Sequence, residues 1–205
     1  MGGGTFRHRQ MQDRYASHVA PINRLVDDAF GRPDLGWMPY VAPLHGGIQA
    51  RVLSVLRDPG PKVRQSADHE HGFLSIENDD PTAEAQAALF ETVGVGPSDV
   101  TPWNAYPWYI NAAPSGAQLN VGLDPLFRVL ELMSRPTALL LQGGHAQTTG
   151  RKFEKRWPGY LDARGIKVVT TYHPGRQALW HKDSDVRQSR LDDRLRAYGR
   201  VADLL

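Results

Sequence analysis

The sequence predicts an α/β fold of three layers, in which a central four-stranded, mostly parallel sheet lies between helices. Short apolar runs rich in β-branched residues recur along the chain, and segments with helical spacing lie between them. The clearest runs stop at Gly-Gly or shortly before Pro-Gly, pairs that end a strand and open a loop. Uninterrupted apolar runs are typical of parallel strands that are buried on both faces.

The composition is that of one globular domain covering residues 1–205, with 40% apolar and 22% charged residues. The chain has no cysteine, which excludes disulfides, thiolate-bound zinc and iron–sulfur clusters. No apolar run is long enough for a membrane span, and the start of the chain has no apolar signal segment. We therefore expect no membrane partner, a cytoplasmic location and, by default, a monomer.

Residues 1–45 are expected to form a helical extension packed on this domain. Apolar side chains recur at helical spacing over residues 6–30, and Pro21 is expected to divide this helix in two. Residues 33–50 are rich in Pro and Gly and are predicted to form a loop.

The first strand is predicted at residues 51–56, followed by a long polar loop at 57–72. The apolar segment 73–76 is too short to assign. A helix is predicted over residues 81–93, because it opens with proline directly after Asp80, a good capping residue.

A second, weaker strand is predicted at residues 100–106, where Pro102 interrupts the apolar run. Residues 107–122 are expected to form a loop, and a helix is predicted over 123–133.

The third strand is predicted at residues 137–142 and is followed by two glycines and a helix at 145–156. The fourth strand is 166–171, and a basic helix at 186–203 completes the pattern. The C-terminal third is basic beside an acidic middle, which fits either a phosphate-facing surface or a solvated amphipathic helix.

Polar residues follow the ends of the four predicted strands. They are Asp58, Asn104, the turn Gly143-Gly144-His145, and His173. Right-handed crossovers bring the carboxyl ends of parallel strands to one edge of a sheet, where ligands bind in open α/β folds. The sequence therefore predicts that Asp58 and His173 meet over one substrate.

Four segments in this order resemble the uracil-DNA glycosylase superfamily over about residues 50–180. Arg57-Asp58-Pro59-Gly60-Pro61 resembles its water-activating motif, and the segment 173–179 resembles its minor-groove loop. Residues 100–105 and 141–147 match the positions of an Asn at a strand end and of a turn before a helix. The resemblance implies a glycosylase that removes uracil or a related modified pyrimidine from DNA and leaves an abasic site, without metal or other cofactor.

The resemblance also implies a role for each of four side chains. Asp58 would position water, His173 would contact the base O2, Phe73 would stack on the flipped base and Asn104 would read its Watson–Crick edge. Each residue also has a structural explanation. Asp58 is a residue type favoured in turns, and His173 could cap its own loop. Phe73 could be a core residue, and Asn104 could form a structural hydrogen bond to a loop.

The chain departs from the family pattern at two places. Gly60 stands where the most uracil-selective branch has a bulky tyrosine, so 5-substituted pyrimidines stay open as substrates. In the second loop, Gly175, Arg176 and Gln177 replace Ser-Pro-Leu. The residue that wedges into DNA could be Gln177, Arg176 or Leu179, and Arg176 could instead contact a phosphate.

Two further functions stay open from the sequence. One is a DNA-binding relative that is catalytically weak or silent, and the other is a hydrolase of small nucleosides or phosphate esters. His69 and His71 invite a metal-site interpretation, but no third ligand is evident, so a polar loop is predicted there.

Overall fold

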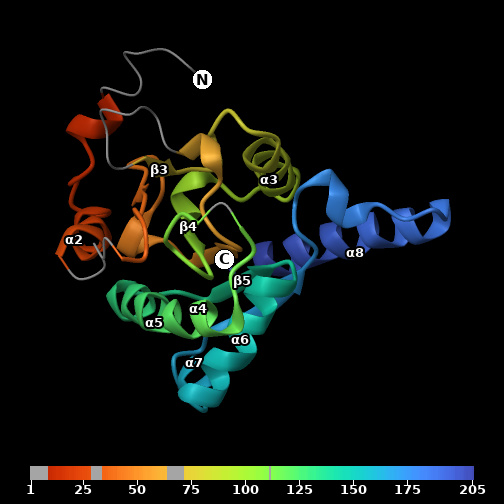
Figure 1. Cartoon of the computed structure of the whole chain (residues 1–205). Coiled ribbons are helices and arrows are strands. Elements are labelled where there is room, and N and C mark those ends of the chain that lie inside the picture. Colours follow the sequence, from red (N-terminus) through yellow and green to blue (C-terminus); the bar gives the residue numbers. More distant parts are fainter. Residues whose placement is uncertain (1–8, 29–33, 64–71, 111) are drawn as a thin grey trace.

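The centre of the protein is a sheet of four parallel strands in the order β4-β2-β5-β6. The computed structural model describes residues 9–28, 34–63, 72–110 and 112–205 (Figure 1). The strands of this sheet are β2 (Val52–Leu56), β4 (Val100–Asn104), β5 (Ala138–Gln142) and β6 (Lys167–Thr171). The predicted three-layer α/β/α fold is confirmed, and this sheet is parallel throughout.

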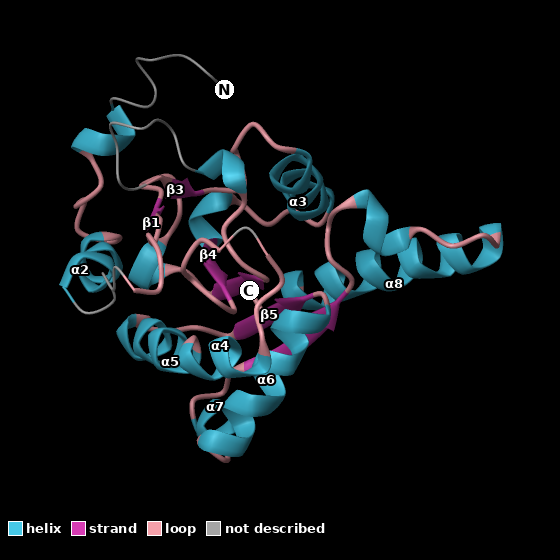
Figure 2. Cartoon of the chain, viewed as in Figure 1, coloured by secondary structure: helices cyan, strands magenta, loops and turns pink. Residues whose placement is uncertain are grey.

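Helices cover both faces of this sheet, as Figure 2 shows. One face is covered by α2, α5 and α6, and the other by α3 and α8. The α-helices are α2 (Ala20–Asp28), α3 (Pro81–Thr92), α4 (Gly116–Val121), α5 (Leu123–Leu132), α6 (Gly144–Arg156), α7 (Tyr160–Ala163) and α8 (Ser184–Ala202). The described residues also include the short 3-10 turns η1 (Gly47–Gln49), η2 (Pro61–Val63), η3 (Pro97–Asp99) and η4 (Arg176–Leu179).

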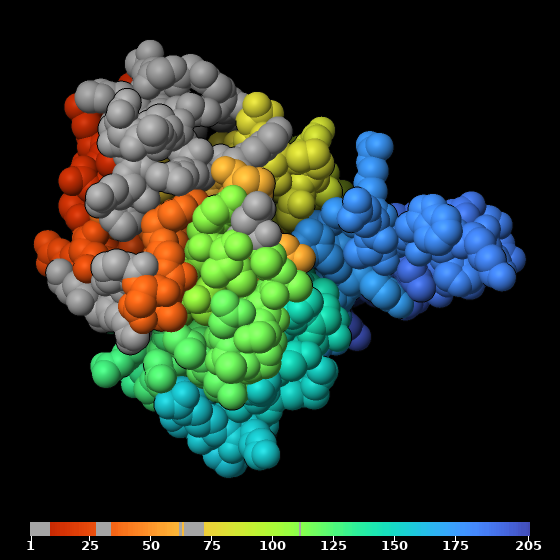
Figure 3. Space-filling model, viewed as in Figure 1, coloured from red at the N-terminus to blue at the C-terminus, as the bar shows by residue number. Residues whose placement is uncertain are grey.

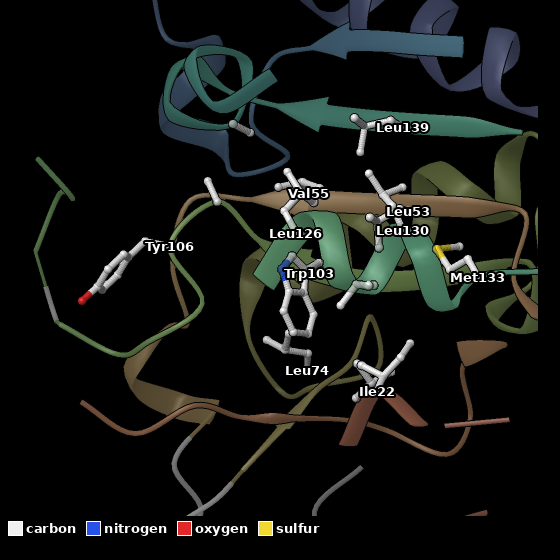
Figure 4. Close-up of a cluster of buried hydrophobic side chains, with 14 of the residues drawn as sticks. Ile22, Leu53, Val55, Leu74, Trp103, Tyr106, Leu126, Leu130, Met133 and Leu139 are labelled. Carbon is white, nitrogen blue, oxygen red and sulfur yellow. The ribbon is translucent and has the colours of Figure 1, made fainter. Parts of the chain in front are cut away.

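The alternation of side chains along the strands creates two hydrophobic cores. Leu53 and Leu139 point into the larger core under α2, α5 and α6, where Figure 4 shows Leu53 beside Leu130 of α5. Val52 and Leu140, one residue along each strand, belong to the second core under α3 and α8. Both faces of β2, β4 and β5 are buried, which explains why their sequences show no two-residue alternation, whereas the edge strand β6 exposes Val168.

The described N-terminal part of the chain contributes side chains to the larger core. Ile22 of α2 is fully buried there. The amide of Asn23 bonds both backbone groups of Val41, at 2.8 and 3.0 Å. Pro21 lies in the first turn of α2, where a missing N–H costs nothing, and residues 13–19 separate α2 from the helical residues 9–12. Residues 6–8 and 29–30 of the predicted first helix lie outside the described residues.

Three small elements lie in segments that the sequence predicted as loops or left unassigned. Strands β1 (Tyr40–Val41) and β3 (Phe73–Leu74) form a separate two-stranded parallel sheet. Helix α4 lies in the predicted loop 107–122, and it begins with a capping box between Ser115 and Gln118. Among the described residues, no helix is both long and apolar enough to cross a lipid bilayer.

A fully buried histidine ties together the segment that follows β3 and the turn that precedes β4. His45 Nε2 accepts from the backbone N–H of Ile76 at 3.3 Å and lies 3.3 Å from the Ser75 hydroxyl. Its Nδ1 lies 3.2 Å from the carbonyl of Pro97, so Nδ1 carries the proton. Burial lowers the pKa of His45 to about 4, which keeps the ring neutral at physiological pH.

We expect His45→Gln to make protein stability less dependent on pH between about 6.5 and 4. The unfolded chain binds a proton at His45 near pH 6.5 and the folded protein only near pH 4, so wild type loses stability as pH falls through this window. The loss approaches about 1.4 kcal/mol per pH unit. Urea unfolding of both proteins at several pH values tests this. A difference in unfolding free energy between the two proteins that stays constant from pH 7 to 4 would contradict this expectation.

Candidate active site

A cavity of about 920 Å³ opens at the carboxyl ends of the four parallel strands. Its walls are the loops that follow β2, β5 and β6, the end of β4, residues 74–75 and the start of α3. Seven of the site residues predicted from the sequence line it: Asp58, Gly60, Asn104, His173, Gly175, Arg176 and Gln177. The structure therefore brings Asp58 and His173, which are far apart in the chain, to one cavity.

The register of the sheet explains why these residues meet. Leu56 at the end of β2 lies opposite Asn104 at the end of β4, and Gln142 of β5 lies opposite Thr171 of β6. The strands therefore end nearly level. One residue separates Leu56 from Asp58, and one residue separates Thr171 from His173, so the two side chains leave the same edge of the sheet.

Asp58 is an almost fully buried carboxylate at the cavity wall. Its side chain is 4% exposed, and its Oδ1 accepts a hydrogen bond from Nε of Arg57. Burial raises the pKa of Asp58, while Arg57 and, more weakly, His145 act to lower it. The side chain of Arg57 is half exposed, so its charge is screened by water and burial prevails. This carboxylate is well suited to accept a proton from a bound water.

His173 is held as a neutral ring with one defined tautomer. Its Nδ1 accepts from the backbone N–H of Gly175 at 3.0 Å, which leaves the proton on Nε2. Burial lowers the pKa of His173, and the positive charges of Arg57 and Arg194 lower it further, while Asp80 acts in the other direction. The Nε2–H group is therefore a hydrogen-bond donor at neutral pH.

Two glycines pack closely against this histidine. Gly143 has φ +86° and ψ 168°, a conformation that only glycine adopts readily, and a Cβ there would lie 3.3 Å from Cβ of His173. A Cβ on Gly175 would lie 3.1 Å from Nδ1 of His173. The lack of a side chain at these two glycines, which follow β5 and β6, thus leaves room for the imidazole ring.

Helix α8 holds the loop that carries His173 in place. Arg194 is 9% exposed, and its Nη1 donates to the carbonyl of Pro174 at 2.7 Å. Its Nε has no hydrogen-bond partner among the described residues. The guanidinium therefore both anchors the loop and places a positive charge near the imidazole.

Asn104 presents an unsatisfied amide at the cavity. The residue is 2% exposed, and its Nδ2 has no hydrogen-bond partner among the described parts of the chain. A buried amide N–H₂ without a partner costs free energy, so a ligand group that accepts from it would be stabilised. The side chain is suited to recognise a carbonyl oxygen of a bound molecule.

Phe73 and Leu179 are the two predicted site residues that do not line the cavity. Phe73 is 1% exposed and packs in the larger core, with its ring centroid 5.9 Å from that of Tyr40. Pairing with β1 turns its ring inward, and Leu74 and Ser75 reach the cavity instead. Leu179 ends the turn η4 outside the lining.

Sequence reasoning missed the polar residues beneath the cavity. Gln86 of α3 and Gln142 of β5 both line it, and both donate from Nε2 to Oγ of Ser54 at 2.8 Å. The hydroxyl of Tyr198 on α8 donates to Oε1 of Gln142 at 2.5 Å. The available signal was a glutamine at a position expected to be buried, in a strand or on an inner helix face. Buried amides are nearly always hydrogen-bonded, so such a glutamine indicates a polar partner nearby.

The start of α3 also reaches the cavity, although the sequence identified it only as a helix start. Asp80 caps the helix by accepting from the N–H groups of Thr82 and Ala83, at 2.9 and 3.0 Å. Asn78, Asp80 and Thr82 all line the cavity. Among the described residues, no group of three acidic or imidazole side chains could hold a metal, and His69 and His71 lie outside them.

Comparison of the chain with models of known protein families and with curated proteins finds no match in either set.

We expect Gly143→Ala to lower stability by about 1–3 kcal/mol, because alanine at this positive φ is strained and its Cβ crowds His173. The matched control is Gly144→Ala, where a Cβ meets nothing within 4 Å and φ is not positive. That control should change stability by less than about 1 kcal/mol. Denaturant unfolding of both variants is the measurement, and equal effects would show that the constraint at Gly143 is absent.

Proposed function

We propose that the protein is a DNA glycosylase related to the uracil-DNA glycosylase superfamily. Its reaction would be hydrolysis of the bond between deoxyribose and uracil, or a related modified pyrimidine, in DNA. The observation that carries this proposal is the meeting of Asp58, His173 and the unpartnered amide of Asn104 in one cavity. The four motifs that resemble the superfamily support it from the sequence.

The proposed reaction assigns complementary roles to the carboxylate and the imidazole. As the bond between C1′ and N1 breaks, positive charge develops on the sugar and negative charge on the base. Asp58 stabilises the cation, orients a water toward C1′ and accepts its proton. The Nε2–H of His173 donates to O2 of the leaving base, where negative charge accumulates, because Nδ1 is occupied by the N–H of Gly175.

Base selection is assigned to Asn104 and to the space at Gly60. The free Nδ2–H₂ of Asn104 would donate to O4 of uracil, and its oxygen would accept from N3–H. A Cβ at Gly60 would meet nothing within 4 Å, so the cavity has room beside this residue. This space supports a site that admits pyrimidines with a substituent at C5.

We expect Asp58→Asn to reduce excision of uracil by at least a hundredfold, because an amide cannot accept the proton of water. The same variant should be more stable than wild type at pH 7. Since burial raises the pKa of Asp58, its ionised form destabilises the folded state, and this cost disappears as pH falls below the pKa. A panel of oligonucleotides, each with one modified pyrimidine, is assayed by alkaline cleavage of abasic sites. Thermal unfolding is measured at pH 7 and pH 4.

DNA binding separates this proposal from the other two functions. Asp58→Asn should retain affinity for a uracil-containing oligonucleotide, and that affinity should fall as salt rises. A wild-type protein that binds DNA without cleaving any substrate of the panel would be the silent relative. A protein whose activity is confined to free nucleosides or phosphate esters, with no salt-dependent DNA affinity, would overturn the DNA assignment.

We expect Asn104→Asp to shift selectivity toward cytosine. A carboxyl oxygen accepts from the N4 amino group of cytosine, whereas the amide of Asn104 matches the O4 and N3–H of uracil. Rates of excision are compared for uracil and cytosine in otherwise identical oligonucleotides. An unchanged ratio of the two rates, at reduced or full activity, would remove Asn104 from the base-binding wall.

A further inference from the structure

A second, shallower hollow adjoins the cavity and contains the most exposed large apolar side chain of the described residues. It has a volume of about 390 Å³ and is lined by Arg176, Gln177 and Trp180. Trp180 is 71% exposed. Arg176 and Gln177 also line the main cavity, so the two spaces share a wall. The segment after β6 and the start of α8 project from the body, as the blue atoms in Figure 3 show.

The loop that carries Trp180 is braced by α8. Nη1 of Arg190 donates to the carbonyl of Trp180 at 2.8 Å, and its guanidinium carbon lies 5.7 Å from the ring centroid of Tyr172. Nη1 of Arg187 donates to the carbonyl of His181 at 2.6 Å. The backbone N–H of Trp180 itself bonds the carbonyl of Gln177 at 3.2 Å. The exposed indole is therefore displayed on a fixed backbone.

An exposed indole on a fixed backbone offers a flat apolar face to a ligand. The residues around it supply the other groups that a nucleobase requires. Trp180 offers the stacking surface, Arg176 a guanidinium and Gln177 an amide that can donate and accept. Lys182 and Arg187 add positive charge close by, against the carboxylate of Asp183, which caps α8.

We propose that this hollow, the Trp180 hollow, binds an unpaired base of DNA next to the nucleotide held in the main cavity, and that Trp180 stacks on that base. The inference rests on the proposed function, since it needs DNA in the cavity. Extruding one nucleotide from a duplex unstacks its neighbours and leaves the opposite base without a partner. The base in the hollow thus comes either from the same strand or from the complementary strand.

Equilibrium binding of fluorescein-labelled oligonucleotides tests the proposal. Single strands and duplexes, each containing one uracil, are titrated with wild type, Trp180→Ala and Trp180→Phe, and anisotropy is recorded. We expect Trp180→Ala to weaken binding about tenfold, as the loss of one aromatic–base stack does, and Trp180→Phe to stay within about threefold of wild type. The matched control is Leu195→Ala, an exposed apolar side chain of α8 outside both linings, with unchanged affinity expected.

The two arms identify the strand that supplies the base. Weaker binding of both single strands and duplexes supports a base of the same strand. Weaker binding of duplexes alone supports the opposite base. Unchanged affinity of Trp180→Ala for both forms, or a loss equal to that of Leu195→Ala, overturns the proposal.

Tryptophan fluorescence gives a readout that is independent of excision. Stacking of a base on Trp180 should quench part of the emission when wild type is titrated with the uracil-containing duplex, which presents a base of either strand, and this part should be absent in Trp180→Phe. Equal quenching in the two proteins would overturn the proposal. If wild type excises uracil but Trp180→Ala binds and quenches normally, only this inference fails. If wild type has no affinity for DNA, the proposed function fails with it.

Discussion

The level carboxyl ends of four parallel strands are the constraint on which the site depends. Each strand is held in register by its neighbours, so Leu56, Asn104, Gln142 and Thr171 reach the same edge of the sheet. The residues that directly follow these strand ends must therefore lie close together. Burial of β2, β4 and β5 on both faces makes this frame rigid, and a shift of one residue in any strand would turn all its side chains to the opposite face.

Much of the fold could be predicted because buried parallel strands have an unmistakable composition. The run at β5 is a row of leucines, those at β2 and β6 are rich in valine or threonine, and each is followed within three residues by glycine or proline. The order of strands and helices follows from them. Strands β1 and β3 escaped prediction because two residues carry no periodicity. Helix α4 is short and opens with Gly116, a poor helix former, so its capping box was the only local signal.

The site was predictable where a residue follows a strand end and not where it depends on side-chain direction. Asp58, Asn104 and His173 are placed by backbone topology alone. Phe73 lies next to the cavity in sequence, but the pairing of β3 with β1 decides that Leu74 and Ser75 reach the wall. Gln86 of α3 and Gln142 of β5 both donate to Ser54 of β2. These contacts join segments that are distant in the chain, so no local sequence pattern predicts them.

Helix α8 belongs at once to the second core, through Tyr198, and to the loop of His173, through the bond from Arg194 to the carbonyl of Pro174. Fraying of this helix would therefore release the imidazole while most of the sheet stayed intact. On warming, loss of the position of His173 should precede global melting, and slow amide hydrogen exchange in α8 should mark the population in which His173 is held in place. The stability of this arrangement of the site is then set by α8 and not by the average stability of the whole molecule.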